Sequence, residues 1–305
     1  MSSVRATTAE QMRGQQGRLG AGDFGSGLAR CQHRLEMAAG FCQTPRPMEL
    51  DEYRKMFEAE ERHFWFRGSR AVVLDWVVRA VEESGRGGSA EPGSTLRIVD
   101  VGAGTGGMLT RVASHFGPRC QVLGVEYAAA GVAFARSRGL QVVRGGLPAL
   151  PLRDGGFDLA LSMDVFEHVE GDVAAMAAVR RVLRPGGRLV TTVPALRWLW
   201  SEHDEALHHF RRYHRAELLE RLRQAGFKIR HASYYNGFLL PPIAAVRVLG
   251  RLRGKRASTQ TPTSDVAEVP EPFNGALAAV FASEAAWLRH APLPVGASLI
   301  VDAEA

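Results

Sequence analysis

A glycine-rich turn stands between an apolar run and a helical pattern. The run is Leu96–Val101, and the turn reads Gly-Ala-Gly-Thr-Gly-Gly at 102–107. Glycine lacks a Cβ, so the backbone can turn tightly and approach a ligand closely, and the next helix begins with free N–H groups. The spacing satisfies both the GxGxxG pattern of dinucleotide sites and the GxGxG pattern of nucleoside-methionine sites.

Glu126 ends the next apolar run, nineteen residues beyond Gly107. A carboxylate at that edge can accept hydrogen bonds from both ribose hydroxyls. The turn and this acid together predict a site for an adenosine ligand of either kind. The alternative is a tight turn beside a surface glutamate.

A second group of chemically capable residues occupies the segment ALRWLWSEHDEALHHFRRYHRAEL at 195–218. In an open parallel sheet this connection leaves the carboxyl edge, where the ligand crevice lies. Histidine can remove a proton from a substrate because its pKa lies near neutrality. A polar surface loop is the alternative. We expect the catalytic candidates His208, His209 and Tyr213 here, with Trp200, His203, Arg211 and Arg212 binding the substrate.

No metal site is expected from the sequence. Asp204 and His208 are one helical turn apart and His203 is adjacent, but no HExxH or CxxC pattern accompanies them. The cysteines are odd in number and widely spaced, at Cys31, Cys42 and Cys120. They favour neither a disulfide framework nor a zinc ribbon, and they indicate a reducing, cytoplasmic compartment.

The composition is that of a globular protein. Of 305 residues, 46% are hydrophobic and 23% charged, and the net charge of +6 is mild. No stripe of interleaved basic and aromatic residues appears, so we expect no nucleic-acid partner. No apolar run is long enough to cross a bilayer. An apolar stretch before the basic segment 251–256 favours either a helix that caps the substrate pocket or peripheral membrane contact.

The elements that must position these residues follow an alternating pattern. Short β-branched runs alternate with helical patterns, which predicts βαβ units around a parallel sheet. Met48–Ser84 predicts two helices with a break near Gly68, and 1–47 lacks a periodic pattern and is expected to be disordered. Strands are expected at 96–101, 120–125, 140–144, 157–163, 188–193, 227–235 and 297–303, and helices near 107–116, 128–138, 171–183, 215–225 and 275–290.

Four motifs together resemble those of class I S-adenosylmethionine-dependent methyltransferases, in the small-molecule branch that includes quinone-biosynthesis enzymes. They are VDVGAGTGG, VEY, GGLPALPLRDGGFDLALSMDVFEHV and VLRPGGRLVTTVP. The resemblance covers roughly Tyr53 to Val301, and FDLALSMDVFEHV is its most specific part. It implies an α/β, Rossmann-like, seven-stranded and mostly parallel sheet flanked by helices, with a final antiparallel strand.

The resemblance also implies a domain organisation. An N-terminal extension at 1–47 would precede a helical lid and linker at 48–94. The methyltransferase domain would follow at 95–305, with substrate-capping insertions near 195–215 and 236–273.

Residue by residue, the resemblance implies an S-adenosylmethionine site. Asp100 would organise the glycine loop beside the methionine moiety, Glu126 would hold the ribose, and Tyr127 would lie against the adenine. Gly146 stands where an acidic residue often contacts the adenine, so the backbone N–H of Leu147 would serve a ring nitrogen instead. The remaining residues implied are Gly102, Gly104 and Gly106 facing the cofactor, Asp164 near the transferable methyl, and His168 as a catalytic or structural histidine.

The expected function is transfer of a methyl group from S-adenosylmethionine to an oxygen, nitrogen or carbon of a small-molecule or lipid-linked acceptor. Two alternatives stay open at this point. One is an NAD(P)-dependent oxidoreductase, because GxGxxG is also satisfied. The other is a non-catalytic methyltransferase-like binding domain. The acceptor, the atom methylated and the oligomeric state are not determined by the sequence.

Overall fold

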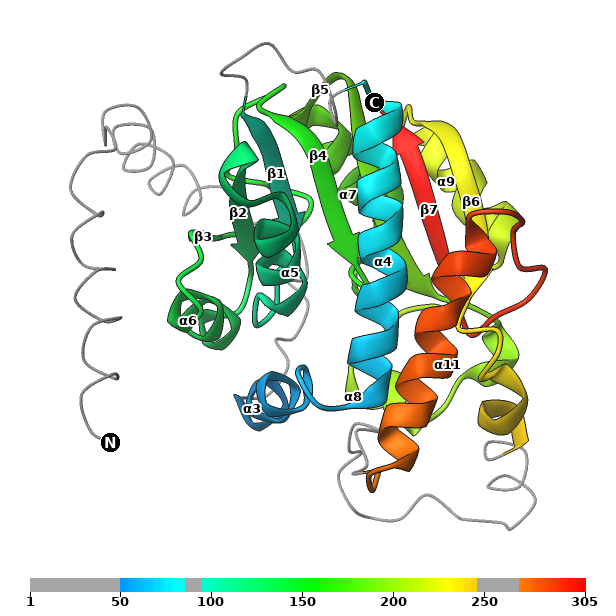
Figure 1. Cartoon of the computed structure of the whole chain (residues 1–305). Coiled ribbons are helices and arrows are strands. Elements are labelled where there is room, and N and C mark those ends of the chain that lie inside the picture. The colour runs from blue at the N-terminus through cyan, green and yellow to red at the C-terminus, as the bar shows by residue number, and fades with distance from the viewer. Residues whose placement is uncertain (1–49, 86–94, 246–268) are drawn as a thin grey trace, which may run out of the picture. The chain divides into compact units, whose positions relative to one another are not determined.

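The computed structural model describes residues 50–85, 95–245 and 269–305. All of these residues lie in one compact unit, 45–305, drawn in colour in Figure 1. The expectations for the extension 1–47 and for the basic segment 251–256 concern residues outside the described part. Among the described helices, none combines the length and apolar character that crossing a membrane requires.

A seven-stranded sheet has the order β3-β2-β1-β4-β5-β7-β6. The strands from β3 to β5 pair in parallel, and β7 runs antiparallel to both β5 and β6. This confirms the predicted seven-stranded, mostly parallel sheet with an antiparallel final strand. The bounds are β1 Leu96–Val101, β2 Cys120–Glu126, β3 Val142–Arg144, β4 Phe157–Met163, β5 Leu183–Pro194, β6 Lys228–Tyr235 and β7 Ser298–Glu304.

The strand order reverses beside β1. The chain passes from β1 outward to β2 and β3, and then returns to β4 on the other side of β1. In an open α/β sheet, the crevice outside the carboxyl ends at such a reversal is the usual ligand site. The residues that follow β1, β2 and β4 are therefore brought to one edge.

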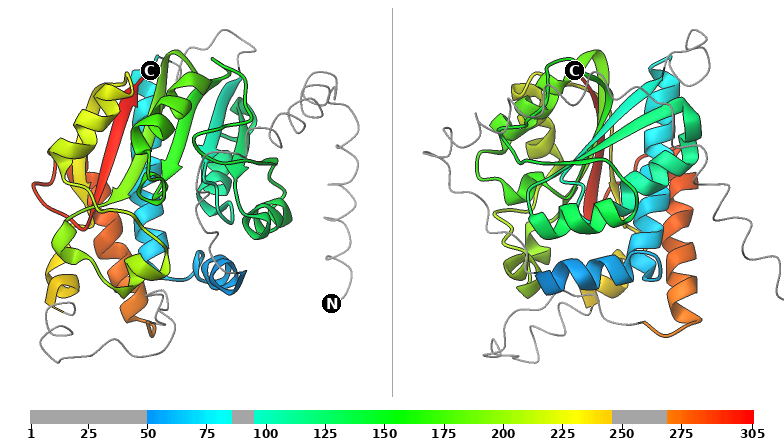
Figure 2. Two further views of the ribbon diagram at one scale, coloured as in Figure 1. Left: turned by 180° about the vertical axis from the view of Figure 1, so that it is seen from behind. Right: turned by 90° about the vertical axis from the view of Figure 1, so that its left-hand side faces the viewer.

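Two apolar cores cover the two faces of the sheet. On one face α4 (Phe64–Glu83), α5 (Gly107–Phe116) and α11 (Phe273–Leu288) pack on Ile98, Leu161 and Ile300. On the other face of the sheet, α7 (Asp172–Val182) and α9 (Arg215–Gln224) pack on the neighbouring residues of the same strands, such as Val99, Ala160 and Val301. Figure 2 shows helices on both sides of the sheet. Strands buried on both faces explain the nearly continuous apolar runs seen in the sequence.

The break between the first two helices lies at residues 60–63, which corrects the prediction of a break near Gly68. Helix α3 spans Leu50–Ala59, and Gly68 lies inside α4. A Cβ at Gly68 would lie 2.5 Å from the side chain of Phe281. This glycine therefore allows α4 and α11 to approach closely, side by side as Figure 1 shows.

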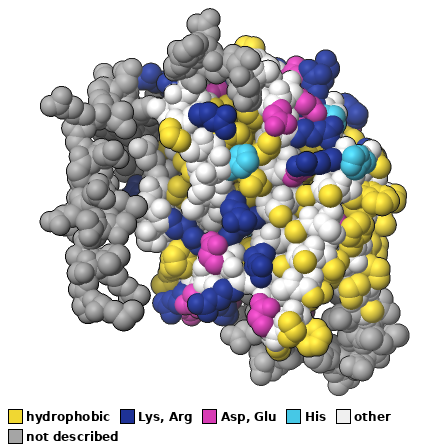
Figure 3. Space-filling model, viewed as in Figure 1, with side chains coloured by type: hydrophobic (Ala, Val, Ile, Leu, Met, Phe, Trp, Pro, Cys, Tyr) yellow, Lys and Arg dark blue, Asp and Glu magenta, His cyan; other side chains and the backbone are white. Residues whose placement is uncertain are grey.

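An apolar stripe remains exposed on α11. Phe273, Val280 and Trp287 are seven residues apart, which places them on one side of the helix. All three are exposed, Phe273 to 68%. In Figure 3 hydrophobic side chains gather on the right of the face, where α11 runs in the same view.

Candidate active site

The glycine loop leaves β1 in the backbone conformation that glycine favours. Gly102, Gly104 and Gly106 have φ angles of 82°, 55° and 83°. A Cβ at Gly102 would lie 2.4 Å from Val165, so that position is closed by packing. A Cβ at Gly104 would meet only the terminal methyl of Met56, at 3.3 Å. Gly104 is therefore the loop position that is open towards α3.

Glu126 ends β2 and holds the loop. The Gly104 N–H donates to Oε2 of Glu126 at 2.8 Å, and the Ala128 N–H donates to Oε1 at 2.8 Å. The hydroxyl of Tyr53, on α3, donates to Oε1 at 3.0 Å, and burial followed by the charge of Glu126 raises the pKa of Tyr53. Of these three donors, only the Gly104 N–H is on Oε2, so this oxygen can still accept a hydrogen bond from a ribose hydroxyl.

Asp100 lies beside the loop with an unsatisfied oxygen. Its side chain is buried, and Oδ1 has no hydrogen-bond partner among the described residues. Burial, with smaller contributions from Glu126 and Glu60, raises the pKa of Asp100 to about 7. A buried carboxyl group with one unsatisfied oxygen fits a ligand that brings a positive charge, such as the amino group of S-adenosylmethionine.

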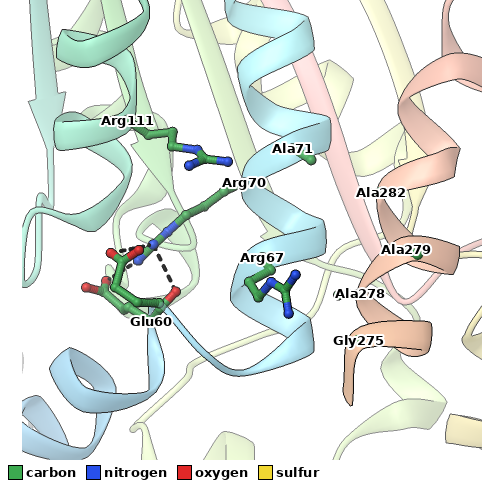
Figure 4. A pocket seen from close by; sticks show the side chains of 10 residues that line it. Glu60, Arg67, Arg70, Ala71, Arg111, Gly275, Ala278, Ala279 and Ala282 are labelled. Atoms are coloured by element: carbon green, nitrogen blue, oxygen red, sulfur yellow. Dashed lines mark hydrogen bonds and ion pairs between the residues drawn. The ribbon is translucent and has the colours of Figure 1, made fainter. Parts of the chain in front are cut away.

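An ion-pair network ties the α3–α4 connection to the glycine loop. Arg70 pairs with Glu60 at 3.1 Å and donates to its backbone carbonyl at 2.9 Å, as the dashed lines in Figure 4 show. Arg138 also reaches Glu60, at 2.7 Å, and donates to the carbonyl of Thr105 at 3.0 Å. A cavity of about 420 Å³ lies beside this network, with Arg67, Arg70 and Arg111 in its lining.

The adenine-side candidates come together after β2 and β3. A Cβ at Gly146 would lie 3.1 Å from the ring of Tyr127, so the loop after β3 runs against that ring. Tyr127 is 36% exposed, and Leu147 is partly buried beside a core cluster. The roles of Tyr127 and the Leu147 N–H in binding adenine stay predictions.

A cluster of acids and histidines follows β4. Asp164 accepts a hydrogen bond from the Thr192 hydroxyl at 3.1 Å, and burial raises its pKa despite that bond. The short helix η2 (Phe166–His168) then places Glu167 and His168 beside His209. The rings of His168 and His209 meet edge to face with centroids 4.6 Å apart.

The protonation of this cluster follows from burial. The Glu167 side chain is fully buried, and burial together with Asp164 raises its pKa well above the usual range. Burial, reinforced by His209, lowers the pKa of His168 to about 3, so His168 is neutral at ordinary pH. His168 and His209 were each predicted from the sequence as site residues, but their proximity to each other and to Glu167 was not predicted.

Asp204 organises the segment after β5. It is fully buried at the start of α8 (Glu202–Ala206) and accepts a hydrogen bond from Nδ1 of His209 at 2.9 Å. Arg212 donates to both of its oxygens, at 2.8 and 2.9 Å, and to the Ala195 carbonyl. Burial alone would raise the pKa of Asp204, but the hydrogen bonds from His209 and Arg212 hold it below its ordinary value.

Three residues with roles predicted from the sequence make contacts inside the protein, and those predicted roles remain untested. Arg212 is buried with both sides of its guanidinium group paired, which favours a structural role over binding of a substrate anion. Tyr213 is fully buried, and its hydroxyl donates to Asp172 at 2.7 Å, a contact that favours a structural role; its catalytic role stays a prediction. Arg211 pairs with Asp172 at 2.8 Å and donates to the Glu170 carbonyl.

The remaining candidates lie near the cluster without a defined role. His208 is exposed, in a left-handed turn with φ 57° directly after α8. The ring of His203 is centred 6.5 Å from that of His209, and the indole N–H of Trp200 reaches Glu205 at 3.4 Å. Catalysis by His208 and substrate binding by His203 and Trp200 stay predictions.

Comparison with known proteins agrees with this geometry. Residues 99–191 match the family model described as "Methyltransferase domain". The malonyl-[acyl-carrier protein] O-methyltransferase of Methylococcus capsulatus is 35% identical over 53% of this chain and 65% of its own length. The ubiquinone biosynthesis O-methyltransferase of Ruegeria pomeroyi is 32% identical over 37% of this chain and 48% of its own length. The chain thus spans less than two thirds of each of these relatives.

A solved structure confirms the fold. A chain in a complex that contains the Haloferax volcanii Trm112 methyltransferase activator aligns over 85% of this chain and 99% of its own length, with a TM-score of 0.50 and 16% identity. Residues 99–191 are thus similar to a methyltransferase domain, and the sheet order and the glycine loop with Glu126 agree with that similarity. These comparisons favour a methyltransferase that uses S-adenosylmethionine over an oxidoreductase.

Proposed function

We propose that the chain transfers a methyl group from S-adenosylmethionine to an oxygen, nitrogen or carbon of a small-molecule or lipid-linked acceptor. The observation that carries the proposal is the unsatisfied, buried Asp100 beside Glu126 and the glycine loop. A cationic nucleoside fits this arrangement, because Asp100 can pair with its charge and Glu126 can accept from its ribose. The named relatives act at oxygen, which supports oxygen as the atom methylated.

When bound, S-adenosylmethionine supplies an electrophilic methyl group on a positively charged sulfur. The chain's task is to hold the acceptor in line with that methyl, to exclude water, and to take the proton of an acceptor hydroxyl. His168 and His209 are the histidines that the fold brings together at Glu167, three residues after Asp164. Nδ1 of His209 is hydrogen-bonded to Asp204, which leaves the lone pair on Nε2.

The cofactor assignment is tested by titration calorimetry. The full chain should bind S-adenosylmethionine or S-adenosylhomocysteine and should not bind NADH. Gly104→Val should abolish binding because its side chain enters the open side of the loop, and Glu126→Ala should weaken it because the ribose acceptor is lost. Gly156→Ala is the matched control, since a Cβ there meets only the Arg153 carbonyl at 3.7 Å. Binding of NADH without binding of S-adenosylmethionine would contradict the proposal.

The acceptor can be sought directly. Native extract incubated with isotopically labelled S-adenosylmethionine should yield a labelled product when wild-type chain is added and none with Gly104→Val. Mass spectrometry of that product identifies the acceptor and the atom methylated. Absence of a labelled product from every extract, with cofactor binding intact, would support the non-catalytic alternative.

We propose further that the enzyme works in the cytoplasm at a membrane surface. The exposed stripe Phe273, Val280 and Trp287 can enter the interfacial region of a bilayer, and the sequence places a basic segment at 251–256. The full chain should sediment with anionic lipid vesicles, and Trp287→Ser should reduce the bound fraction. Equal recovery of both proteins in the supernatant would contradict membrane contact.

A further inference from the structure

Glu167 is a buried carboxyl group without a hydrogen-bond partner. Its side chain has no exposure to solvent, and neither oxygen is hydrogen-bonded to a described residue. Burial of an ionised carboxylate without a partner is strongly unfavourable. A protonated group would still need an acceptor for its O–H. The side chain therefore lacks a partner that can satisfy both oxygens, and a cation can do so.

Two histidines face the same carboxyl group. Nε2 of His168 and Nε2 of His209 each lie 4.0 Å from Oε1 of Glu167, which is too long for a hydrogen bond. One ligand atom from each of the three residues lies within 4.8 Å of the others. Two imidazoles and one carboxylate form a donor set that binds Zn²⁺ and other divalent transition metals and leaves positions free for water or substrate.

The fold orients one imidazole as metal sites do. Oδ1 of Asp204 accepts from Nδ1 of His209 at 2.9 Å, which places the lone pair on Nε2, the atom that faces Glu167. Arg212 in turn fixes the Asp204 carboxylate with two hydrogen bonds. A carboxylate behind a ligating histidine is the usual outer layer of a metal site, since it sets the tautomer and the ring orientation.

We infer that Glu167, His168 and His209 bind one divalent transition-metal ion, for which Zn²⁺ is the test ion. Zinc bonds of about 2.0–2.2 Å place tetrahedral ligands about 3.4 Å apart, so each 4.0 Å separation must close by roughly half an ångström. The two imidazole nitrogens lie within 4.8 Å of each other, so that separation must close by at most roughly 1.4 Å. The inference departs from the sequence prediction of no metal site, which had weighed Asp204 and His208 because they are one helical turn apart.

The site also indicates a class of acceptor, and this step rests on the proposed function. Asp164, predicted to lie near the transferable methyl, follows β4 three residues before Glu167. A metal with free positions can bind an acceptor oxygen and lower the pKa of its hydroxyl, which favours acceptors with an ionisable hydroxyl. The proton then leaves to solvent, the oxygen bonds to the methyl carbon, and the methyl–sulfur bond breaks with its electron pair left on sulfur.

A second cluster offers a matched control. Glu83, His231 and Asp302 also gather within ligand distance. Their carboxylates, however, are already paired, Glu83 with Arg79 at 2.7 Å and Asp302 with Arg188 at 2.8 Å. A metal ion there would have to displace arginine, so we expect no binding at this cluster.

The test is zinc binding by the full chain after removal of metal with a chelator. Zn²⁺ per chain is measured by elemental mass spectrometry, and affinity by competition with a chromogenic chelator. Wild type and His231→Ala should each bind one ion. Glu167→Gln and His209→Ala should bind at least about 100-fold more weakly, since loss even of an outer-layer partner costs about 10–100-fold. Glu167→Gln is nearly isosteric and leaves the Asp204–His209 bond intact, so its fold should be kept.

Equal zinc affinity in wild type and Glu167→Gln, or less than one ion per chain at saturation, would overturn the site. Calorimetry with S-adenosylmethionine on the same samples distinguishes the two proposals. Cofactor binding without zinc binding would reject the metal site alone. Zinc binding without cofactor binding would reject the proposed function alone. In labelled extract, chelation should abolish an O-methylated product and Zn²⁺ should restore it. Product yield unchanged by chelation would overturn the assigned role.

Discussion

Cofactor binding should depend on pH through Asp100. Burial raises the pKa of this carboxyl to about 7 in the cofactor-free protein, so it is largely protonated at pH 6. If the ionised carboxylate is the form that pairs with the amino group of S-adenosylmethionine, binding must release that proton. Affinity should therefore rise as the pH rises from 5 to 7, a range in which an α-amino group with a pKa of about 7.7–8.0 remains mostly protonated.

The size of the effect follows from the ionised fraction of Asp100. With a pKa of about 7, that fraction is about one half at pH 7, about one eleventh at pH 6 and about one hundredth at pH 5. The apparent affinity scales with the binding-competent fraction, so binding should be about fivefold weaker at pH 6 and about fiftyfold weaker at pH 5 than at pH 7.

Titration calorimetry in two buffers with different ionisation enthalpies measures both the affinity and the protons released. Close to one proton per cofactor should be released at pH 5.5, and about half a proton at pH 7. In Asp100→Asn, binding should be weaker at pH 7 and the affinity should no longer change between pH 5 and 7. A flat profile in wild type, or the same slope in Asp100→Asn, would refute the assignment of Asp100 to the cofactor charge.

Four further outcomes are expected. Folding raises the pKa of Asp100 from 3.8 to about 7 in the cofactor-free protein. Its contribution to stability is therefore present below pH 3.8 and is lost as the pH rises through about 7. The melting temperature should accordingly depend less on pH over this window in Asp100→Asn than in wild type. Gly68→Ala should reduce the free energy of unfolding by about 1–3 kcal/mol, since its Cβ meets Phe281 at 2.5 Å, and Gly156→Ala should change it little; equal denaturation midpoints would contradict the packing argument. Tyr213→Phe should cost about 1–3 kcal/mol in urea unfolding because Asp172 loses a buried donor. It should leave the yield of labelled product unchanged, whereas loss of product with cofactor binding intact would support the catalytic role of Tyr213. Tyr53→Phe should bind S-adenosylmethionine up to about tenfold more tightly, because Oε1 of Glu126 then becomes open to a second ribose hydroxyl; weaker binding would mean that the tyrosine hydroxyl assists the cofactor.

The glycine loop and the acid beside it were predictable because these features are local. The glycines at 102, 104 and 106 adopt the positive φ angles that their type allows, and Glu126 stands at the end of the adjacent strand. The loop conformation and the position of Glu126 each depend on a short stretch of chain and on the parallel pairing of β1 with β2. Gly68 was predicted to end a helix, but it lies inside α4 and allows close packing against Phe281. A glycine can have either role, and the local sequence does not distinguish them.

The sequence by itself determined the succession of strands and helices, the glycine loop and the acid that follows it, since the period of apolar residues and the backbone freedom of glycine act over a few residues. Only the tertiary structure decided which polar side chains meet. Asp172 binds Tyr213 from 41 positions away, and Glu167 faces His209 across a similar separation. Such pairs form because the parallel strands bring their carboxyl ends to one edge, and no local pattern specifies which of several nearby histidines, arginines and acids will be buried together there.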